Sequence, residues 1–189
     1  ATQDLLWEQG YSATSPKDIM RRSGAGQGSM YHHFTNKQEL AVVALECSAQ
    51  SMRHDTEKLL ATDGSAYEIA TAYLRRQRDV LKGCRMGRMT FDADVLNTPE
   101  LIEPVKRTFV WLLEALTVLF ERGRDQGEFA ADIDARNLAS LVVATVQGGY
   151  VLARATRDTD AFDAAVEGAA ALLRKATVPL TTEVSDHSE

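Results

Sequence analysis

The sequence predicts an all-α fold, with an N-terminal three-helix helix-turn-helix unit followed by a larger helical domain. Apolar residues recur at three- and four-residue spacing along most of the chain, and no convincing alternating pattern of a strand occurs. Capping residues and glycines place three short helices within about 35 residues near the start, the layout of a helix-turn-helix. With 189 residues, the chain is long enough to bury a sizeable core.

The first two helices are bounded by clear signals. Gly10 is expected to end the first helix. Ser15 is a favourable N-cap, Pro16 suits the first helical position and Asp18 suits the third, so a second helix should begin there. Gly24 can adopt the left-handed conformation that ends this helix after about residue 23.

A third short helix is expected over residues 27–34, and Asn36 with Glu39 forms a capping pair that begins a long helix through about residue 60. The apolar residues available to the small N-terminal unit are few, so it should lean on this long helix. They are Leu5, Leu6, Ile19, Met20, Met30, Tyr31 and Phe34.

Further helices are expected at about 66–82, 88–96, 103–124, 134–156 and 160–175, with Pro104 as a candidate first-turn residue of the third. We therefore predict an N-terminal domain at 1–40, a helical domain at 41–176 and a flexible tail at 177–189. Because Ala1 falls inside an apparent helix, we expect native residues to precede it.

The net charge of −6 is unevenly distributed. Residues 1–54 hold five basic and five acidic residues, so the remaining 16 basic and 22 acidic residues account for all of it. An acidic protein can therefore still carry a neutral DNA-binding unit whose affinity depends on local groups. No signal peptide or membrane-length apolar stretch is evident, so a cytoplasmic protein without membrane contact is expected.

The two cysteines, Cys47 and Cys84, cannot form a disulfide framework. We interpret them as small buried hydrophobic residues, with a redox or ligand-contact role as the alternative.

The stretch 24–37 carries the strongest functional signal. On a helix, Met30 and Phe34 point toward the core, while short polar side chains and a glycine occupy the other faces. Such a face can enter the major groove, where Gln contacts adenine and Ser or His reach bases or phosphates. Lys37, in the first turn of the next helix, can join backbone amides at a phosphate.

The order and spacing of about 40 residues resemble the TetR family of bacterial regulators. The matching residues are Gly10-Tyr11, Thr14-Ser15, Ile19-Met20, Ser23-Gly24-Ala25, Gly28, Met30-Tyr31, His33-Phe34, Lys37 and Leu40. The chain departs from the family pattern at Gly26, where a hydroxylic N-cap is usual. The resemblance implies DNA contacts from Thr14, Ser15, Lys17, Gln27, Gly28, Ser29, Tyr31, His32, His33 and Lys37.

Other interpretations of this stretch are weaker. Adjacent His32 and His33 diverge by about 100° on a helix and cannot easily chelate one metal ion, so no metal site is predicted. The glycines at 24, 26 and 28 lack the preceding strand and following Lys of a nucleotide loop. No nucleophile–base pair is evident, so we expect neither an enzyme nor a cofactor. A purely structural role for residues 27–37 stays open.

The last two predicted helices are rich in small and apolar residues, which favours a four-helix interface between two subunits. The alternative is that this pair fills the core of a monomer. The expected interface residues are Leu141, Thr145, Gly148, Gly149, Leu152, Phe162, Ala165, Val166, Ala169 and Leu172.

Residues between about 66 and 124 are rich in Met and aromatic side chains, which suit the walls of a cavity for apolar or aromatic ligands. Core packing is the simpler alternative. The expected apolar walls are Tyr73, Met86, Met89, Phe91, Phe109, Leu112, Leu113, Leu116 and Tyr150. The expected polar anchors are Arg88, Asp92 and Gln147.

Together these features predict a dimeric, ligand-responsive transcriptional regulator that represses a palindromic double-stranded DNA operator until a small-molecule effector releases it. Two alternatives are a helical ligand-binding homodimer that has lost DNA binding and a transcriptional activator of the same family.

Overall fold

In the computed structural model, the described part of the chain is residues 1–178, without the side chains of Gln27, Ser29 and Tyr31. Ten α-helices make up this part, and an isolated bridge joins Phe129 and Thr177. The predicted all-α fold is confirmed. Of the expected tail, residues 179–189 lie outside the described residues.

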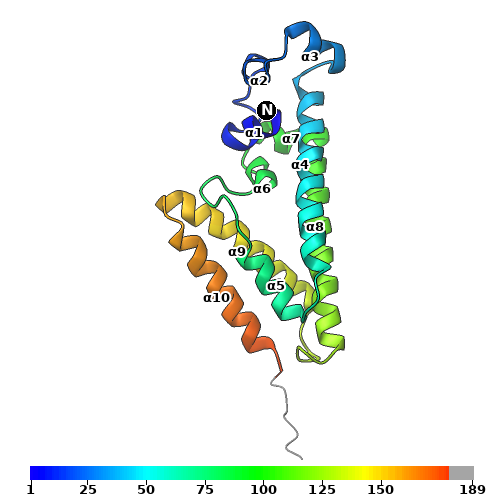
Figure 1. Cartoon of the computed structure of the whole chain (residues 1–189), viewed down its shortest axis with the longest axis vertical. Helices are drawn as coiled ribbons and strands as arrows, with labels where there is room; N and C mark the ends of the chain where they lie inside the picture. The colour runs from blue at the N-terminus through cyan, green and yellow to red at the C-terminus, as the bar shows by residue number, and fades with distance from the viewer. Residues whose placement is uncertain (179–189) are drawn as a thin grey trace, which may run out of the picture.

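The first four helices follow the predicted signals closely. They are α1 (Thr2–Gln9), α2 (Pro16–Ser23), α3 (Gln27–His33) and α4 (Lys37–Leu60). The side chain of Ser15 caps α2 and the backbone of Gly24 ends it at a φ of 70°. The side chain of Asn36 caps α4 by accepting from the amide of Glu39 at 2.9 Å. Helices α2 and α3 lie at one end of the molecule, beyond the start of α4 (Figure 1).

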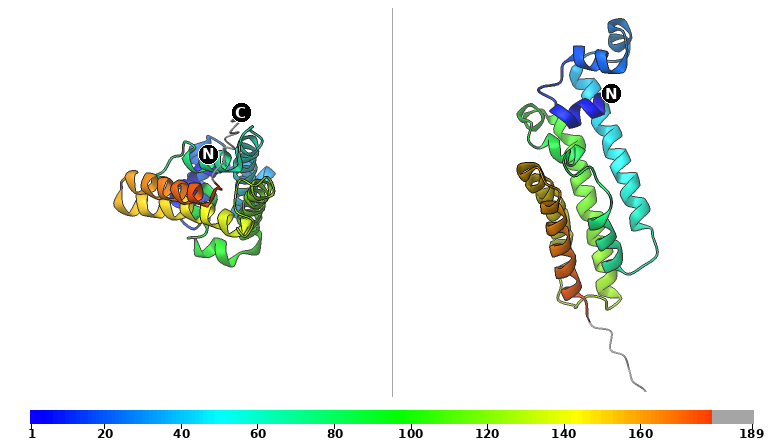
Figure 2. Two further views of the ribbon diagram at one scale, coloured as in Figure 1. Left: turned by 90° about the horizontal axis from the view of Figure 1, so that it is seen from below. Right: turned by 60° about the vertical axis from the view of Figure 1, so that its left-hand side comes forward.

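The remaining helices build the body of the molecule. They are α5 (Ala66–Arg75), α6 (Arg85–Met89), α7 (Ala93–Asn97), α8 (Pro99–Asp125), α9 (Ala135–Thr156) and α10 (Asp160–Ala176). Helix α8 runs beside α4, and α9 and α10 form a hairpin that packs on α8 and α5 (Figures 1 and 2).

The expected helix at 66–82 is too long, because α5 ends at Arg75. The guanidinium of Arg78 donates to the carbonyls of Tyr73, Leu74 and Arg76 and so satisfies the last turn of α5. Neither Gly nor Pro marks this end, so periodicity alone extends the helix too far.

The expected helix at 88–96 is two short helices, because Asp92 interrupts it. The carboxylate of Asp92 accepts from the amides of Asp94 and Val95 and starts α7. Helix α8 begins at Pro99 rather than near residue 103, so Pro104 lies inside it and not at its first turn. Proline at the first helical position costs no backbone hydrogen bond, which favours this start.

In the described part of the chain, three clusters of buried apolar residues hold the fold together. The largest joins α5, α8, α9 and α10. A second packs α1, α4, α6 and α7 against the start of α8. The third, at the end of the molecule that carries α2 and α3, has Leu5, Ile19 and Met30 as its buried members among the described side chains. Contrary to expectation, Cys47 is exposed, whereas Cys84 is half-buried and caps α6 through its sulfur.

Helix α9 is long and apolar enough to cross a membrane by length and composition, with a mean hydropathy of 1.3 over its most apolar stretch. The core helix of a soluble protein satisfies the same criterion, and α9 packs against both α8 and α10. We therefore interpret α9 as a core helix.

Candidate DNA interface and ligand cavity

Helices α2 and α3 form a compact corner at the tip of the molecule. Ser15 and Asp18 cap each other reciprocally, so the start of α2 is fixed by two side chains. Gly24 turns the chain, and Gly26 begins α3 without a side-chain cap. The buried side chain of Met30 anchors α3 against Leu5 and Ile19. This packing leaves Gly28, His32 and His33 of α3 exposed to solvent.

The exposed residues of α3 include Gly28, His32 and His33. A Cβ added to Gly28 would meet no atom within 4 Å, so another molecule can approach the backbone there. The rings of His32 and His33 lie edge to face with their centroids 4.9 Å apart. The predicted contacts from the side chains of Gln27, Ser29 and Tyr31 lie outside the described residues.

The cations around this corner differ in their partners. The guanidinium of Arg21 pairs with Asp18 and that of Arg22 pairs with Glu8. Lys17 is exposed and forms no ion pair within residues 1–178. Lys37 is half-buried, with its ammonium 4.0 Å from the centroid of the Tyr11 ring. Burial lowers the pKa of Lys37, against the opposing effect of two nearby carboxylates.

Thr14, predicted to contact DNA, is placed differently. It is only 1% exposed, and its hydroxyl donates to the carbonyl of Gly10 at 2.6 Å. The same oxygen accepts from the side chain of Gln9 at 3.3 Å. Thr14 therefore stabilises the loop before α2, and we remove it from the proposed interface.

Helix α1 connects this corner to the body through contacts with α6 and its flanks. The indole of Trp7 donates to the carbonyl of Gly83 at 2.9 Å, and the guanidinium of Arg85 stacks 4.1 Å from the Trp7 ring centroid. Arg85 also pairs with Asp4 at 3.0 Å. The hydrogen bond from Arg85 holds the pKa of Asp4 below its ordinary value.

A second connection joins the loop after α1 to the start of α7. The hydroxyl of Ser12 donates to Asp92 at 2.6 Å, and its amide donates to the other oxygen of that carboxylate at 2.8 Å. Burial opposes ionisation of Asp92, but these hydrogen bonds prevail and lower its pKa. Sequence reasoning missed this junction because its partners lie about 80 residues apart.

A cavity of about 530 Å³ opens below α1, between α4, the 76–84 segment and α9. Its walls combine apolar side chains with three arginines. The lining residues are Gln3, Ser48, Ser51, Met52, Asp55, Leu59, Arg76, Gln77, Arg78, Asp79, Gly83, Cys84, Arg85, Met86 and Tyr150. Burial raises the pKa of Tyr150 to about 12, so its phenol is neutral at physiological pH.

Comparison with known proteins identifies the family. A model of the bacterial regulatory proteins of the tetR family matches residues 1–44, and a model of the tetracyclin repressor-like C-terminal domain matches residues 64–169. The chain belongs to the TetR family. It is therefore a transcriptional regulator with a helix-turn-helix DNA-binding domain and not an enzyme.

The relatives of this chain match it over most of its length. The uncharacterized regulator YxaF of Bacillus subtilis is 24% identical over 178 residues, 90% of each protein. The transcriptional repressor ComR of Escherichia coli is 26% identical, covering 79% of this chain and 74% of ComR. A TetR transcriptional regulator from Chloroflexus aurantiacus superposes with a TM-score of 0.84 at 27% identity, covering 93% of this chain and 91% of that one.

Most of the predicted ligand-binding residues line the cavity, lie in the core or pack at the edge of the core. Only Met86 and Tyr150 line the 530 Å³ cavity. Tyr73, Met89, Leu112 and Leu116 are buried core residues, while Phe109 and Leu113 pack at the edge of the core. The Met and aromatic residues thus mostly fill the core, the simpler of the two interpretations. Sequence patterns cannot separate a cavity wall from a core, because both are apolar.

The remaining predicted ligand residues lie elsewhere. Phe91 is 73% exposed and lines none of the described cavities, and Asp92 is occupied by Ser12 and the start of α7. The side-chain oxygen of Gln147 lies 2.3 Å from the position that a Cβ on Gly87 would occupy. Gln147 therefore packs against α6. Arg88 is half-buried on α6.

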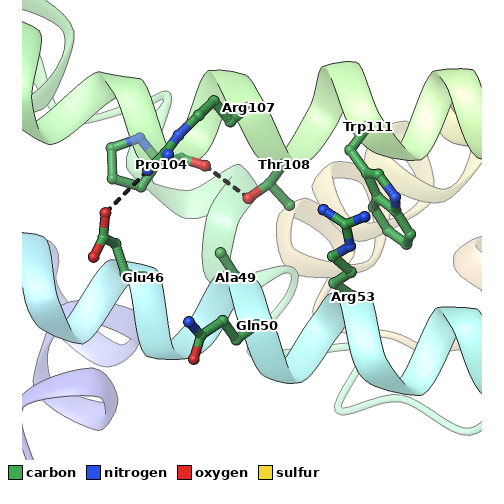
Figure 3. Close-up of a pocket in the computed structure, with 8 residues that line it drawn as sticks. All are labelled: Glu46, Ala49, Gln50, Arg53, Pro104, Arg107, Thr108 and Trp111. Atoms are coloured by element: carbon green, nitrogen blue, oxygen red, sulfur yellow. Dashed lines mark hydrogen bonds and ion pairs between the residues drawn. The ribbon is translucent and has the colours of Figure 1, made fainter.

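A second, smaller groove of about 250 Å³ lies between α4 and α8 (Figure 3). Its charged groups are already matched, since Arg107 pairs with Glu46 at 3.0 Å and Arg53 pairs with Glu57 at 2.7 Å. The guanidinium of Arg53 also lies 4.8 Å from the centroid of the Trp111 ring. The Arg107–Glu46 and Arg53–Trp111 contacts join α4 to α8, and the charged side chains that line the groove are all paired.

The predicted interface residues separate into two groups. A shallow apolar groove follows the outer face of α9 and α10 and includes eight of them: Leu141, Thr145, Gly148, Gly149, Leu152, Ala165, Ala169 and Leu172. Phe162 and Val166 instead belong to the core of the subunit, where the Phe162 ring packs 5.1 Å from that of Tyr150. One face of the α9–α10 hairpin therefore packs into the core of the subunit, and the other face is exposed to solvent.

Proposed function

We propose that this TetR-family regulator is a homodimer that represses transcription by occupying a palindromic operator and that a small-molecule effector releases it. The observation that carries this proposal is α3, a short helix at the tip of the molecule with an open glycine-containing face. An α-helix of this kind fits the major groove of B-DNA, where base edges are distinguishable. The name of one relative, the repressor ComR, favours repression over activation.

The proposed DNA contacts combine exposed groups around α3 with side chains that the sequence alone predicts to reach DNA. We propose base contacts from Gln27, Ser29, His32 and His33, with Gly28 allowing close approach. The exposed ammonium of Lys17 forms no ion pair within the described residues and suits a phosphate. Further phosphate contacts would come from Ser15, Tyr31 and the start of α4 at Lys37.

Dimerisation is proposed through the α9–α10 groove. Leu152 and Leu172 are about half exposed there, and Cβ atoms on Gly148 and Gly168 would meet nothing within 4 Å in the subunit. Small residues let the helices of a second subunit approach closely, and the exposed leucines gain burial. Two subunits would then place their α3 helices one DNA turn apart, about 34–36 Å.

Effector release is proposed to act through α1. The 530 Å³ cavity lies beneath α1, and α4 both lines the cavity and begins next to α3. A ligand that binds better when α1 is displaced would shift the dimer away from its DNA-binding arrangement. A 100-fold loss of operator affinity needs a coupling of about 2.7 kcal/mol. Because the proposed operator is chromosomal DNA, we propose that the protein acts in the cytoplasm.

The test is selection from a library of random palindromes by wild type, Gly28→Glu and Ala131→Glu. The glutamate at position 28 has room and should not disturb folding, but its carboxylate would repel DNA in the groove. Ala131→Glu adds the same charge in an exposed loop remote from α3. We expect one enriched palindrome for wild type and Ala131→Glu, and none for Gly28→Glu.

Two results would overturn this function. Lack of enrichment by wild type would favour the alternative of a ligand-binding homodimer without DNA activity. Equal enrichment by Gly28→Glu would show that α3 does not enter the groove. A reporter carrying the enriched site over its promoter separates repression, which lowers expression, from activation.

A further inference from the structure

The cavity beneath α1 has an unusual charge pattern for a protein of net charge −6. Three arginines line it, against two carboxylates. Of the carboxylates, Asp79 pairs with Lys82 at 3.6 Å, and Asp55 is exposed on α4. Neither Arg76 nor Arg78 forms an ion pair within residues 1–178. The cavity therefore holds positive charge that the subunit itself leaves unmatched.

Arg78 holds the end of α5 and has one further hydrogen-bond donor. Its two terminal nitrogens hold the end of α5, while its Nε is buried and makes no hydrogen bond in the described residues. Burial lowers the pKa of Arg78, and the neighbouring Arg76 adds to that effect. Burying a cation without an opposite charge is costly, so a nearby anion would stabilise this site.

Arg76 is held in place with its charge available. One terminal nitrogen donates to the hydroxyl of Thr56 at 3.1 Å, and its guanidinium stacks 4.7 Å from the centroid of the Tyr73 ring. A stacked, oriented guanidinium loses little further entropy when it binds a carboxylate through both nitrogens. Arg76 is thus a preorganised anion ligand.

Arg85 joins the cavity to the DNA-binding domain. One terminal nitrogen pairs with Asp4 of α1, and the other is buried and has no partner among the described residues. Its guanidinium also stacks on Trp7 of α1. An anion that engaged Arg85 would compete with Asp4 and weaken one of the contacts that hold α1 against the body.

We propose that the effector of this regulator is an organic anion with an apolar body, whose carboxylate is bound by Arg76 and Arg85. This inference rests on the proposed function and names the chemical class of its effector. Met52, Leu59, Met86 and Tyr150 supply apolar walls for the body of the ligand, and 530 Å³ lies within the range of small-molecule sites. The ligand carboxylate replaces that of Asp4 at Arg85, and α1 is released.

The test is calorimetric titration of the dimer, without DNA, with 2-naphthoate and with its neutral counterpart 2-naphthamide. The two probes share one shape and differ in charge. We expect naphthoate to bind at least about tenfold more tightly, or 1.4 kcal/mol. Arg76→Gln and Arg85→Gln should each lower the affinity for naphthoate about tenfold and leave the affinity for naphthamide unchanged.

Arg75→Gln is the matched control, because Arg75 precedes Arg76 but pairs with Glu167 and does not line the 530 Å³ cavity. It should bind naphthoate as wild type does. Asp4→Asn removes the competing carboxylate and should tighten naphthoate binding several-fold, a gain that misfolding cannot produce.

The proposal is overturned if naphthoate fails to bind, if naphthamide binds equally well, or if Asp4→Asn weakens binding of naphthoate. An equal loss of naphthoate affinity in Arg75→Gln and Arg76→Gln would also overturn it, because the overall positive charge and not a specific contact would then determine the affinity. These outcomes are independent of operator selection, so the DNA-binding function can stand when the anion site fails.

Discussion

The two ends of this molecule are stabilised in opposite ways. Among the side chains that the structure describes, the DNA-proximal corner buries only Leu5, Ile19 and Met30 in its own cluster, and it owes its shape to caps and glycines. The body buries a large continuous cluster across α5, α8, α9 and α10. The corner therefore depends on α1 and α4 for support, and a change at those contacts can move it without unfolding the body. That asymmetry is what a switch requires.

The largest expected effect is in the body. Phe120 is fully buried on α8, with its ring 5.7 Å from that of Phe129. Phe120→Ala should lower the free energy of unfolding by about 3–5 kcal/mol, measured by urea denaturation. Val118→Ala, on the exposed side of the same helix, should change it by less than about 0.5 kcal/mol. Similar costs for both would contradict the assigned core.

The next effect concerns the outer face of the same region. Leu172→Glu places a charge in the α9–α10 groove on a side chain that is 57% exposed in the subunit. Subunit folding should be unaffected, while the dimer dissociation constant rises at least about 100-fold, or 2.7 kcal/mol, by analytical ultracentrifugation. Val118→Glu is the matched control on another face. A dimer that persists in Leu172→Glu would place the interface elsewhere.

In the DNA-proximal corner the effect is smaller and local. Ser15→Ala removes the reciprocal cap of α2 and should cost about 1 kcal/mol. Hydrogen exchange should quicken in α2 and α3 but not in α9, because the two regions have separate cores. Uniformly faster exchange would show that the molecule unfolds as one unit and that the corner has no independence.

The smallest effect is at the junction between the two regions. The pKa of Asp92 is lower in the folded protein than the value of about 3.9 that is ordinary for an Asp in an unfolded chain. The ionised carboxylate therefore stabilises the fold fully above that ordinary pKa, and this contribution is lost as the pH falls through the lowered pKa. Asp92→Asn keeps the shape and the cap of α7. Its urea midpoint should lie below that of wild type at pH 7, and the two midpoints should converge as the pH falls through the lowered pKa of Asp92. A constant difference would contradict this account.

How far the sequence predicts the structure follows the same division. In the corner, Ser15, Gly24 and Asn36 act on residues within a turn of themselves, so periodicity and caps predicted α1 to α4 almost to the residue. In the body, the end of α5 depends on the side chain of Arg78, and the break between α6 and α7 depends on Asp92 and its partner Ser12. Such tertiary contacts leave no local signal.

The proposed ligand cavity shows that limit most clearly. The apolar residues chosen for it mostly pack in the core, and its arginines were not chosen. A signal existed, since Arg75, Arg76 and Arg78 cluster in an otherwise acidic part of the chain. Only the fold shows which of them faces a cavity and which pairs with Glu167.

The central claim is that α3 from each of two subunits reads one half of a symmetric site. Its most direct test is the affinity of the wild-type protein, at fixed salt, for the enriched palindrome and for the same duplex with one half-site scrambled. The account predicts at least about a 100-fold loss on scrambling, since each lost base pair costs about 1–3 kcal/mol. Equal affinity for the two duplexes would contradict it.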